Sequence, residues 1–198
     1  MSTLRIVVVL ALAVAGFGAV LASAAMALGF RSPVFGCCVV GATLGLIVVT
    51  LPVVRWRLPA SLLRVGIRGL DATYRALGVT AFGALLRRPP LRWFNSTVYV
   101  RDGAEPLAAA RDNMLAAEAA HFWALVLTLP FLAWLAWRGA WVAVASMLAT
   151  HAVLNVYPAL HLRLMRARIQ PLIERRACAR HASKQHHPHP TLPLKGRA

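Results

Sequence analysis

The sequence predicts an all-α membrane protein with four transmembrane helices and a basic amphipathic segment at the membrane surface between the second and third. Three observations support this. Of the 198 residues, 59% are hydrophobic and only 14% are charged, a composition typical of multi-pass membrane proteins. The apolar residues gather in four stretches long enough to cross a hydrocarbon core of about 30 Å. The 22 Lys and Arg residues border these stretches, which indicates contacts with membrane lipids and no nucleic-acid partner.

The first two spans are expected at residues 6–28 and 34–54. The motif Leu21-Ala22-Ser23-Ala24 in the first span resembles a signal-peptide cleavage site, so removal of this helix is an alternative. The apolar region is longer than that of the usual signal peptide, which favours an uncleaved helix. In the second span, Gly36, Gly41 and Gly45 let a neighbouring helix approach closely, and Gly41 and Gly45 have the four-residue spacing typical of helix association in membranes.

Residues 58–88 combine apolar side chains at helical period with interleaved arginines, the pattern of one or two helices lying in the membrane interface. Gly78 is a candidate break within this segment, and Pro89-Pro90 ends it because proline cannot continue the backbone hydrogen-bond ladder. Residues 179–198 are rich in His, Pro and Lys and have little to bury. We expect a single membrane domain over residues 1–178, followed by a disordered tail.

The third and fourth spans are expected at residues 119–137 and 140–160. Only a short turn at Arg138-Gly139 separates them, so they should be antiparallel neighbours. With four crossings, every Lys and Arg except Arg31 and Arg138 falls on the side of the two termini. Positive charges accumulate on the cytoplasmic side of membrane proteins. The sequence therefore predicts a cell-membrane protein with both termini in the cytoplasm.

Two pairs of polar side chains lie within or beside these last two spans. Glu118 and His121 are three residues apart and share one face of the third helix, and His151 and Asn155 share a face of the fourth. Because the two helices are antiparallel, we expect both pairs near the cytoplasmic surface, at about the same depth. Ionisable groups at membrane depth are costly and indicate a functional site. Three arginines follow the second pair, at Arg163, Arg166 and Arg168.

These residue types suit acid–base chemistry on an anionic substrate. His121 is a candidate general base with Glu118 orienting its ring, and Asn155 or an arginine is a candidate donor to an oxyanion. The three arginines would hold a carboxylate, a phosphate or a lipid headgroup, but positive-inside anchoring alone also explains them. Glu-x-x-His occurs in di-metal helix bundles as well, but such sites need a second copy of the motif and more carboxylates. We expect no metal.

The motifs around these residues resemble a known family. Glu118-x-x-His121, Asn155-Val156-Tyr157-Pro158 and the arginine run that begins at Arg163 are similar to motifs of the glycosyl-4,4'-diaponeurosporenoate acyltransferases. These are small membrane enzymes of staphyloxanthin-type carotenoid synthesis. The stretch Leu70–Val79 also resembles the family, so the likeness covers residues 70–170, roughly the second half of the chain.

The resemblance implies transfer of a fatty acyl group from an activated donor, such as acyl-CoA, to a sugar hydroxyl of a glycosylated carotenoid or similar glycolipid. It implies no bound cofactor. The residues that match the family's motifs are Glu118 and His121, expected to be catalytic, and Asn155, Arg163, Arg166 and Arg168, expected to bind substrate. The arginine run also departs from the family pattern. Leu162 stands where the family has Gln, and Leu164 and Met165 replace Tyr and Asn.

Two other classes of function fit the same residues. A non-catalytic membrane subunit, for assembly or partner binding, would use Glu118, His121 and Asn155 to join helices through hydrogen bonds. A transporter needs a pathway open to both sides of the membrane, and the single polar cluster without an internal repeat argues against it. The substitution His121→Gln separates the enzyme from the structural alternative, because it removes a base and keeps a polar side chain.

Overall fold

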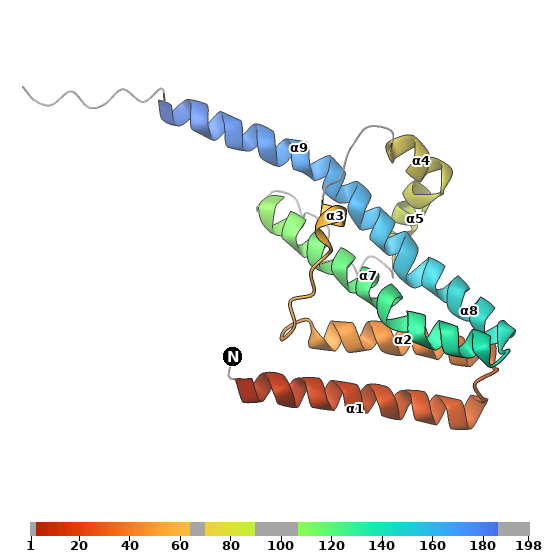
Figure 1. Ribbon diagram of the computed structural model, residues 1–198. Coiled ribbons are helices and arrows are strands. Elements are labelled where there is room, and N and C mark those ends of the chain that lie inside the picture. The colour runs from red at the N-terminus through yellow and green to blue at the C-terminus, as the bar shows by residue number, and fades with distance from the viewer. Residues whose placement is uncertain (1–2, 64–69, 90–106, 186–198) are drawn as a thin grey trace, which may run out of the picture.

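The computed structural model describes residues 3–63, 70–89 and 107–185, and within these ranges the regular structure is entirely helical (Figure 1). Four helices are long and apolar enough to cross a membrane, judged by length and composition. They are α1 (Thr3–Leu28), α2 (Pro33–Thr50), α7 (Leu107–Trp137), and the stretch Trp141–Arg176, which contains α8, a π-helical turn and most of α9. The predicted fold class, an all-α membrane protein with four spans, is confirmed.

The helices α1 and α2 lie side by side at one edge of the molecule (Figure 1). The turn between them contains Gly29, whose φ of 74° is a left-handed conformation that glycine adopts without strain. Ser32 caps α2, since its hydroxyl accepts a hydrogen bond from the Val34 amide at 3.2 Å, and Pro33 occupies the first turn. The helix ends at Thr50, a few residues before the predicted end at residue 54, because Pro52 cannot continue it.

The close approach between α2 and α8 is made at Gly36. A Cβ atom at this position would collide with the Ala143 carbonyl and with the side chain of Ser146. The predicted close approach is confirmed at Gly36 and wrong at Gly41 and Gly45, because a Cβ atom at either of the latter positions would meet nothing within 4 Å. The four-residue spacing alone does not say which face of a helix meets its neighbour, and the tightly packed glycine is one turn closer to the start of α2.

Between α2 and α7 the predicted interfacial segment forms three short helices in its described part. These are α3 (Ala60–Leu63), α4 (Leu70–Ala76) and α5 (Val79–Leu86). Gly78 divides α4 from α5 as expected, with a φ of 73°. Both α4 and α5 pack against α9, so the described part of this segment contacts the bundle. Residues 64–69 and 90–106 lie outside the described residues.

The remaining helices complete the bundle. The turn before α8 (Trp141–His151) contains Gly139, whose φ is 66°. The π-helical turn occupies Ala152–Val156, and α9 (Tyr157–Gln185) extends well beyond the other helices (Figure 1). Helix α9 therefore continues past residue 179, where the disordered tail was predicted to begin, and residues 186–198 lie outside the described residues.

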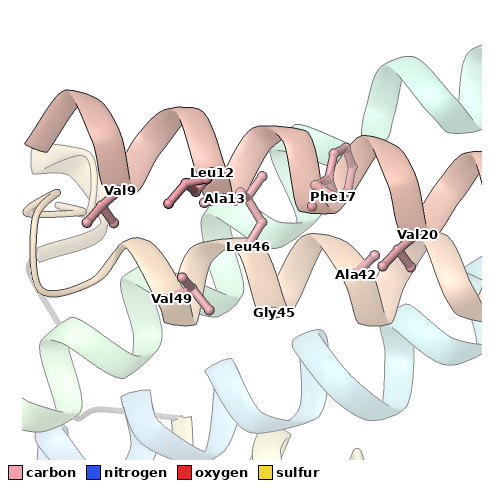
Figure 2. A pocket seen from close by; sticks show the side chains of 10 residues that line it. Val9, Leu12, Ala13, Phe17, Val20, Ala42, Gly45, Leu46 and Val49 are labelled. Carbon is pink, nitrogen blue, oxygen red and sulfur yellow. The ribbon is translucent and has the colours of Figure 1, made fainter.

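An apolar groove of about 560 Å³ runs between α1 and α2. Figure 2 shows the side chains of both helices that line it, including Leu12, Phe17, Leu46 and Val49. The residues that line this groove carry no ionisable side chain. The groove is thus suited to hydrocarbon, and its lining residues belong to different helices from the polar groups described next.

Candidate active site

The site lies between α7 and the continuous helix that contains α8, the π turn and α9. Helices α7 and α9 pack closely along their lengths, and the π turn also contacts α7. A π turn adds a residue to the helix locally and is frequent at functional sites. Here it contains Asn155, which is fully buried. The π turn therefore presents a buried amide to the polar face of α7.

Four side chains form a continuous chain of hydrogen bonds in this interface. His121 Nδ1 lies 3.3 Å from Asn155 Oδ1. Asn155 Nδ2 lies 3.0 Å from His151 Nδ1, and His151 Nε2 lies 2.7 Å from Thr128 Oγ1. The first and last members of this chain, His121 and Thr128, are both on α7, so the chain starts and ends on the same helix.

Glu118 forms a buried ion pair with Arg166. The Oε2 atom of Glu118 accepts from Nε of Arg166 at 2.8 Å and lies 2.6 Å from its second guanidinium nitrogen, Nη2. The two residues are 3% and 6% exposed. Arg166 also donates to the carbonyls of Leu63 at 3.3 Å and Leu62 at 3.5 Å. One guanidinium thus joins α7, α9 and α3, and removal of either charge would leave the other buried without a partner.

Tyr74 brings α4 into this region. Its side chain is buried beside Leu164, Tyr157 and Leu160. Burial raises the pKa of the Tyr74 phenol above its ordinary value, so the hydroxyl stays neutral and remains a hydrogen-bond donor. Tyr74 was not among the predicted site residues.

The three arginines of the predicted cationic rim have different surroundings. Arg166 is buried in the ion pair, Arg163 is half-buried, and Arg168 is exposed. On the same helix, His161 is buried, and its ring packs against Gly83 and lies edge-on to Phe82. Within the described residues, no cluster of three or more His, Cys, Asp or Glu side chains has the arrangement of a metal site.

The structure brings the predicted residues together in two groups rather than one. His121 and Asn155 belong to the hydrogen-bond chain, and Glu118 and Arg166 form the ion pair. His121 was expected to be oriented by Glu118, but in the structure its ring contacts the Asn155 amide, and Glu118 contacts a guanidinium. The sequence placed these groups at one depth, but the partners depend on the rotation of α9 against α7, which the π turn alters.

The fold and site together define an integral membrane protein with buried ionisable groups between two of its helices. The sequence model of the glycosyl-4,4'-diaponeurosporenoate acyltransferase family matches residues 62–175, more than half of the chain. The chain therefore belongs to this family and is an acyltransferase of carotenoid biosynthesis. No curated protein and no solved structure matches it. The matched region begins in α3 and ends in α9, so it contains both polar groups described above.

Proposed function

We propose that the protein transfers a fatty acyl group from a thioester donor such as acyl-CoA to a sugar hydroxyl of a glycosylated carotenoid. The observation that carries the proposal is the 3.3 Å contact between His121 Nδ1 and Asn155 Oδ1. An amide oxygen only accepts hydrogen bonds, so it favours the form of the ring that has its proton on Nδ1. The Nε2 atom then keeps its lone pair, which is the form that a general base requires.

The proposed reaction is direct transfer between the two substrates. The sugar oxygen attacks the thioester carbonyl and forms the new C–O bond, and His121 Nε2 takes the hydroxyl proton. The tetrahedral intermediate then breaks its C–S bond, and the imidazolium returns the proton to the leaving thiolate. The products are an ester and a free thiol, and His121 is again neutral. A direct step suits this sequence because it contains no serine nucleophile motif for a covalent acyl-enzyme.

The surrounding residues support different parts of this reaction. Asn155 orients the base, since both ends of its buried amide already bond to histidines. Arg166 and Glu118 hold α3, α7 and α9 together. Arg163 is half-buried and Arg168 is exposed, so both lie where an anionic donor can reach them. We propose that these two arginines bind the phosphates or the carboxylate of the donor.

The location of the reaction follows from the charge distribution. Nearly all cationic side chains fall on the side of the termini when the four helices cross the membrane. We propose that this side is the cytoplasm. An acyl-CoA donor is cytoplasmic and water-soluble, whereas a glycosylated carotenoid is dissolved in the bilayer. His121 lies within the cytoplasmic half of α7 in this orientation, where the two substrates meet.

The test is an acyl-transfer assay on membranes that contain the protein, with labelled acyl-CoA and a glycosylated carotenoid, analysed by mass spectrometry. The wild type should add one fatty-acyl mass to the acceptor. His121→Gln should lower the rate by about 10²–10⁴-fold, the usual contribution of a general base, at unchanged abundance in the membrane. Leu12→Ala, on the exposed face of α1, is the control and should retain activity.

Either of two results would overturn the proposal. If wild-type membranes leave the glycosylated carotenoid unmodified, the acceptor is a different molecule. If His121→Gln retains full activity, His121 is not the base, and its contacts with Asn155 serve to join α7 and α9. The second result would support the structural interpretation of this cluster, in which interhelical hydrogen bonds only stabilise the bundle.

A further inference from the structure

We propose that Thr128 and His151 are positioning residues that determine which nitrogen of His121 carries its proton. Neither residue is close enough to touch His121 itself, and both act through Asn155. The inference rests on the proposed function for its catalytic consequence, because it concerns the base of that reaction. Each hydrogen bond in this chain has a direction, set by which atom donates and which accepts. We call this set of directions the hydrogen-bond order. It is a property of the folded protein and is measurable without any substrate.

The order begins at Thr128. Its Oγ1 atom lies 2.8 Å from the Ala124 carbonyl oxygen and 2.9 Å from the Leu125 carbonyl oxygen on the preceding turn of α7. Carbonyl oxygens only accept, so the single hydroxyl hydrogen is donated to this turn. Thr128 then has only lone pairs to offer its third neighbour, His151 Nε2 at 2.7 Å. His151 must therefore donate from Nε2, and its Nδ1 atom is the acceptor.

The order continues through the amide of Asn155. Because Nδ1 of His151 accepts, the group that faces it at 3.0 Å must be the amide nitrogen of Asn155. The amide is thereby fixed in one of its two orientations, with Oδ1 toward His121 Nδ1. That nitrogen donates, and Nε2 of His121 keeps its lone pair. The donor and acceptor of each bond are fixed by the bond before it. Thr128, His151 and Asn155 are all buried, and a buried polar atom without a partner is costly.

The π turn contains one member of this chain and follows another. His151 immediately precedes the turn, and Asn155 lies within it. Side chains four residues apart are neighbours on a helical surface, so His151 and Asn155 can bond directly while both face α7. Because a π turn inserts a residue into the helix, it changes the rotation of the residues that follow, and π turns are frequent at functional sites.

Loss of the Thr128 hydroxyl reverses the order. With no acceptor at Nε2, the proton of His151 moves to Nδ1, where it faces the Asn155 amide nitrogen. The amide then rotates to present its oxygen to His151, and its nitrogen turns toward His121. His121 responds by accepting at Nδ1 and carrying its proton on Nε2, the form that cannot take a proton from a hydroxyl group.

The experiment measures the protonation of individual ring nitrogens. The full-length protein is labelled with ¹⁵N-histidine, placed in lipid nanodiscs and observed by solid-state NMR at a pH where the imidazoles are neutral. Spectra of His121→Gln and His151→Asn assign the two signals. The variant pair is Thr128→Val, which removes the hydroxyl and keeps the shape, and Thr128→Ser, which keeps the hydroxyl. Steady-state kinetics of acyl transfer are measured on the same variants.

In the wild type we expect protonated Nδ1 in His121 and protonated Nε2 in His151. Thr128→Val should reverse both assignments and lower kcat by roughly 10- to 100-fold with KM little changed, as expected for loss of an orienting partner. Thr128→Ser should restore the wild-type spectrum and rate. A wild-type His121 protonated on Nε2, or a folded Thr128→Val variant with unchanged spectrum, would overturn the proposal.

The spectra also separate this inference from the proposed function. If the wild type shows the expected nitrogens but transfers no acyl group to the glycosylated carotenoid, the hydrogen-bond order stands and the assigned reaction is wrong. If acyl transfer is present and Thr128→Val changes neither the spectrum nor kcat, the reaction stands and Thr128 and His151 have no positioning role. The wild-type spectrum decides the first step even if Thr128→Val does not fold.

Discussion

The α1–α2 region and the α7–α9 region of this protein place polar and apolar side chains in opposite ways. In α1, only 6% of the most apolar window is buried within the protein, and the groove against α2 is lined by hydrocarbon (Figure 2). Between α7 and α9 the buried residues include Glu118, Asn155 and Arg166. Lipid replaces water around the spans, so apolar groups need no burial and polar groups do. Burial of polar side chains is therefore the better guide to the site.

The family match also distinguishes the α1–α2 region from the α7–α9 region. The matched region begins at residue 62 and excludes both α1 and α2. The polar chain and the ion pair lie wholly within it. We interpret α1 as the part of the bundle that faces lipid, and α2 as the helix that joins α1 to α7 and α8. The three predictions that follow test this division, and the largest expected effect comes first.

The largest effect is expected at the ion pair. Arg166→Met leaves the Glu118 carboxylate buried without a partner, which should cost about 3–5 kcal/mol of folding free energy. Thermal unfolding in detergent measures this. Arg175→Met, at an exposed position of the same helix, should change stability by less than about 0.5 kcal/mol. A further Glu118→Leu change on the Arg166→Met background should recover much of the loss, because it removes the uncompensated charge.

An Arg166→Met variant as stable as Arg175→Met would contradict this account of the polar region. It would mean that Glu118 finds another partner or water when the guanidinium is removed. The division between the two regions would then rest on the hydrogen-bond chain alone, and the ion pair would be a peripheral contact of α3.

The second effect concerns the glycines of α2, which faces both regions. Gly36→Ala should destabilise the protein by about 1–3 kcal/mol, because the new Cβ atom collides with backbone of α8. Gly41→Ala meets open space and should be neutral or stabilising by up to about 1 kcal/mol, from higher helix propensity. The two melting temperatures in the same detergent test this. Equal effects at both positions would show that α2 packs differently.

The smallest effect is expected in the apolar groove. Leu12 is 68% exposed and lines the groove, so Leu12→Trp adds apolar area in contact with lipid. Acyl transfer should stay within about twofold, and the free energy of unfolding should change by less than about 0.5 kcal/mol. A large rise in KM for the carotenoid would instead assign the groove to the acceptor's hydrocarbon chain and would end the division of roles between the two regions.

Much of the fold was predictable because its signals are local. Uncharged apolar stretches predict spans by length alone, and Gly78 predicts a break because its backbone conformation suits glycine. His121 and Asn155 were also found from sequence, since polar residues inside apolar runs are conspicuous. Helix α7 begins at Leu107, well before the predicted third span at residues 119–137, because a helix can extend past the apolar stretch that crosses the membrane.

The pairing of the polar groups was not predictable in this way. Glu118 and Arg166 are 48 positions apart, and nothing local says that this arginine, and not Arg163 or Arg168, turns toward α7. Tyr74 joined the site only because α4 packs on α9. The π turn carries no sequence signal that we recognise, although it shifts the side chains that follow it around the helix axis.

The sequence by itself therefore determined the class of protein, the four spans and the family motifs. Those properties depend on hydrophobicity and on distance along one helix. The tertiary structure decided which of those residues touch: His121 with Asn155, Glu118 with Arg166, and His151 with Thr128. These contacts depend on the rotation and spacing of one helix against another, and packing over whole interfaces sets both.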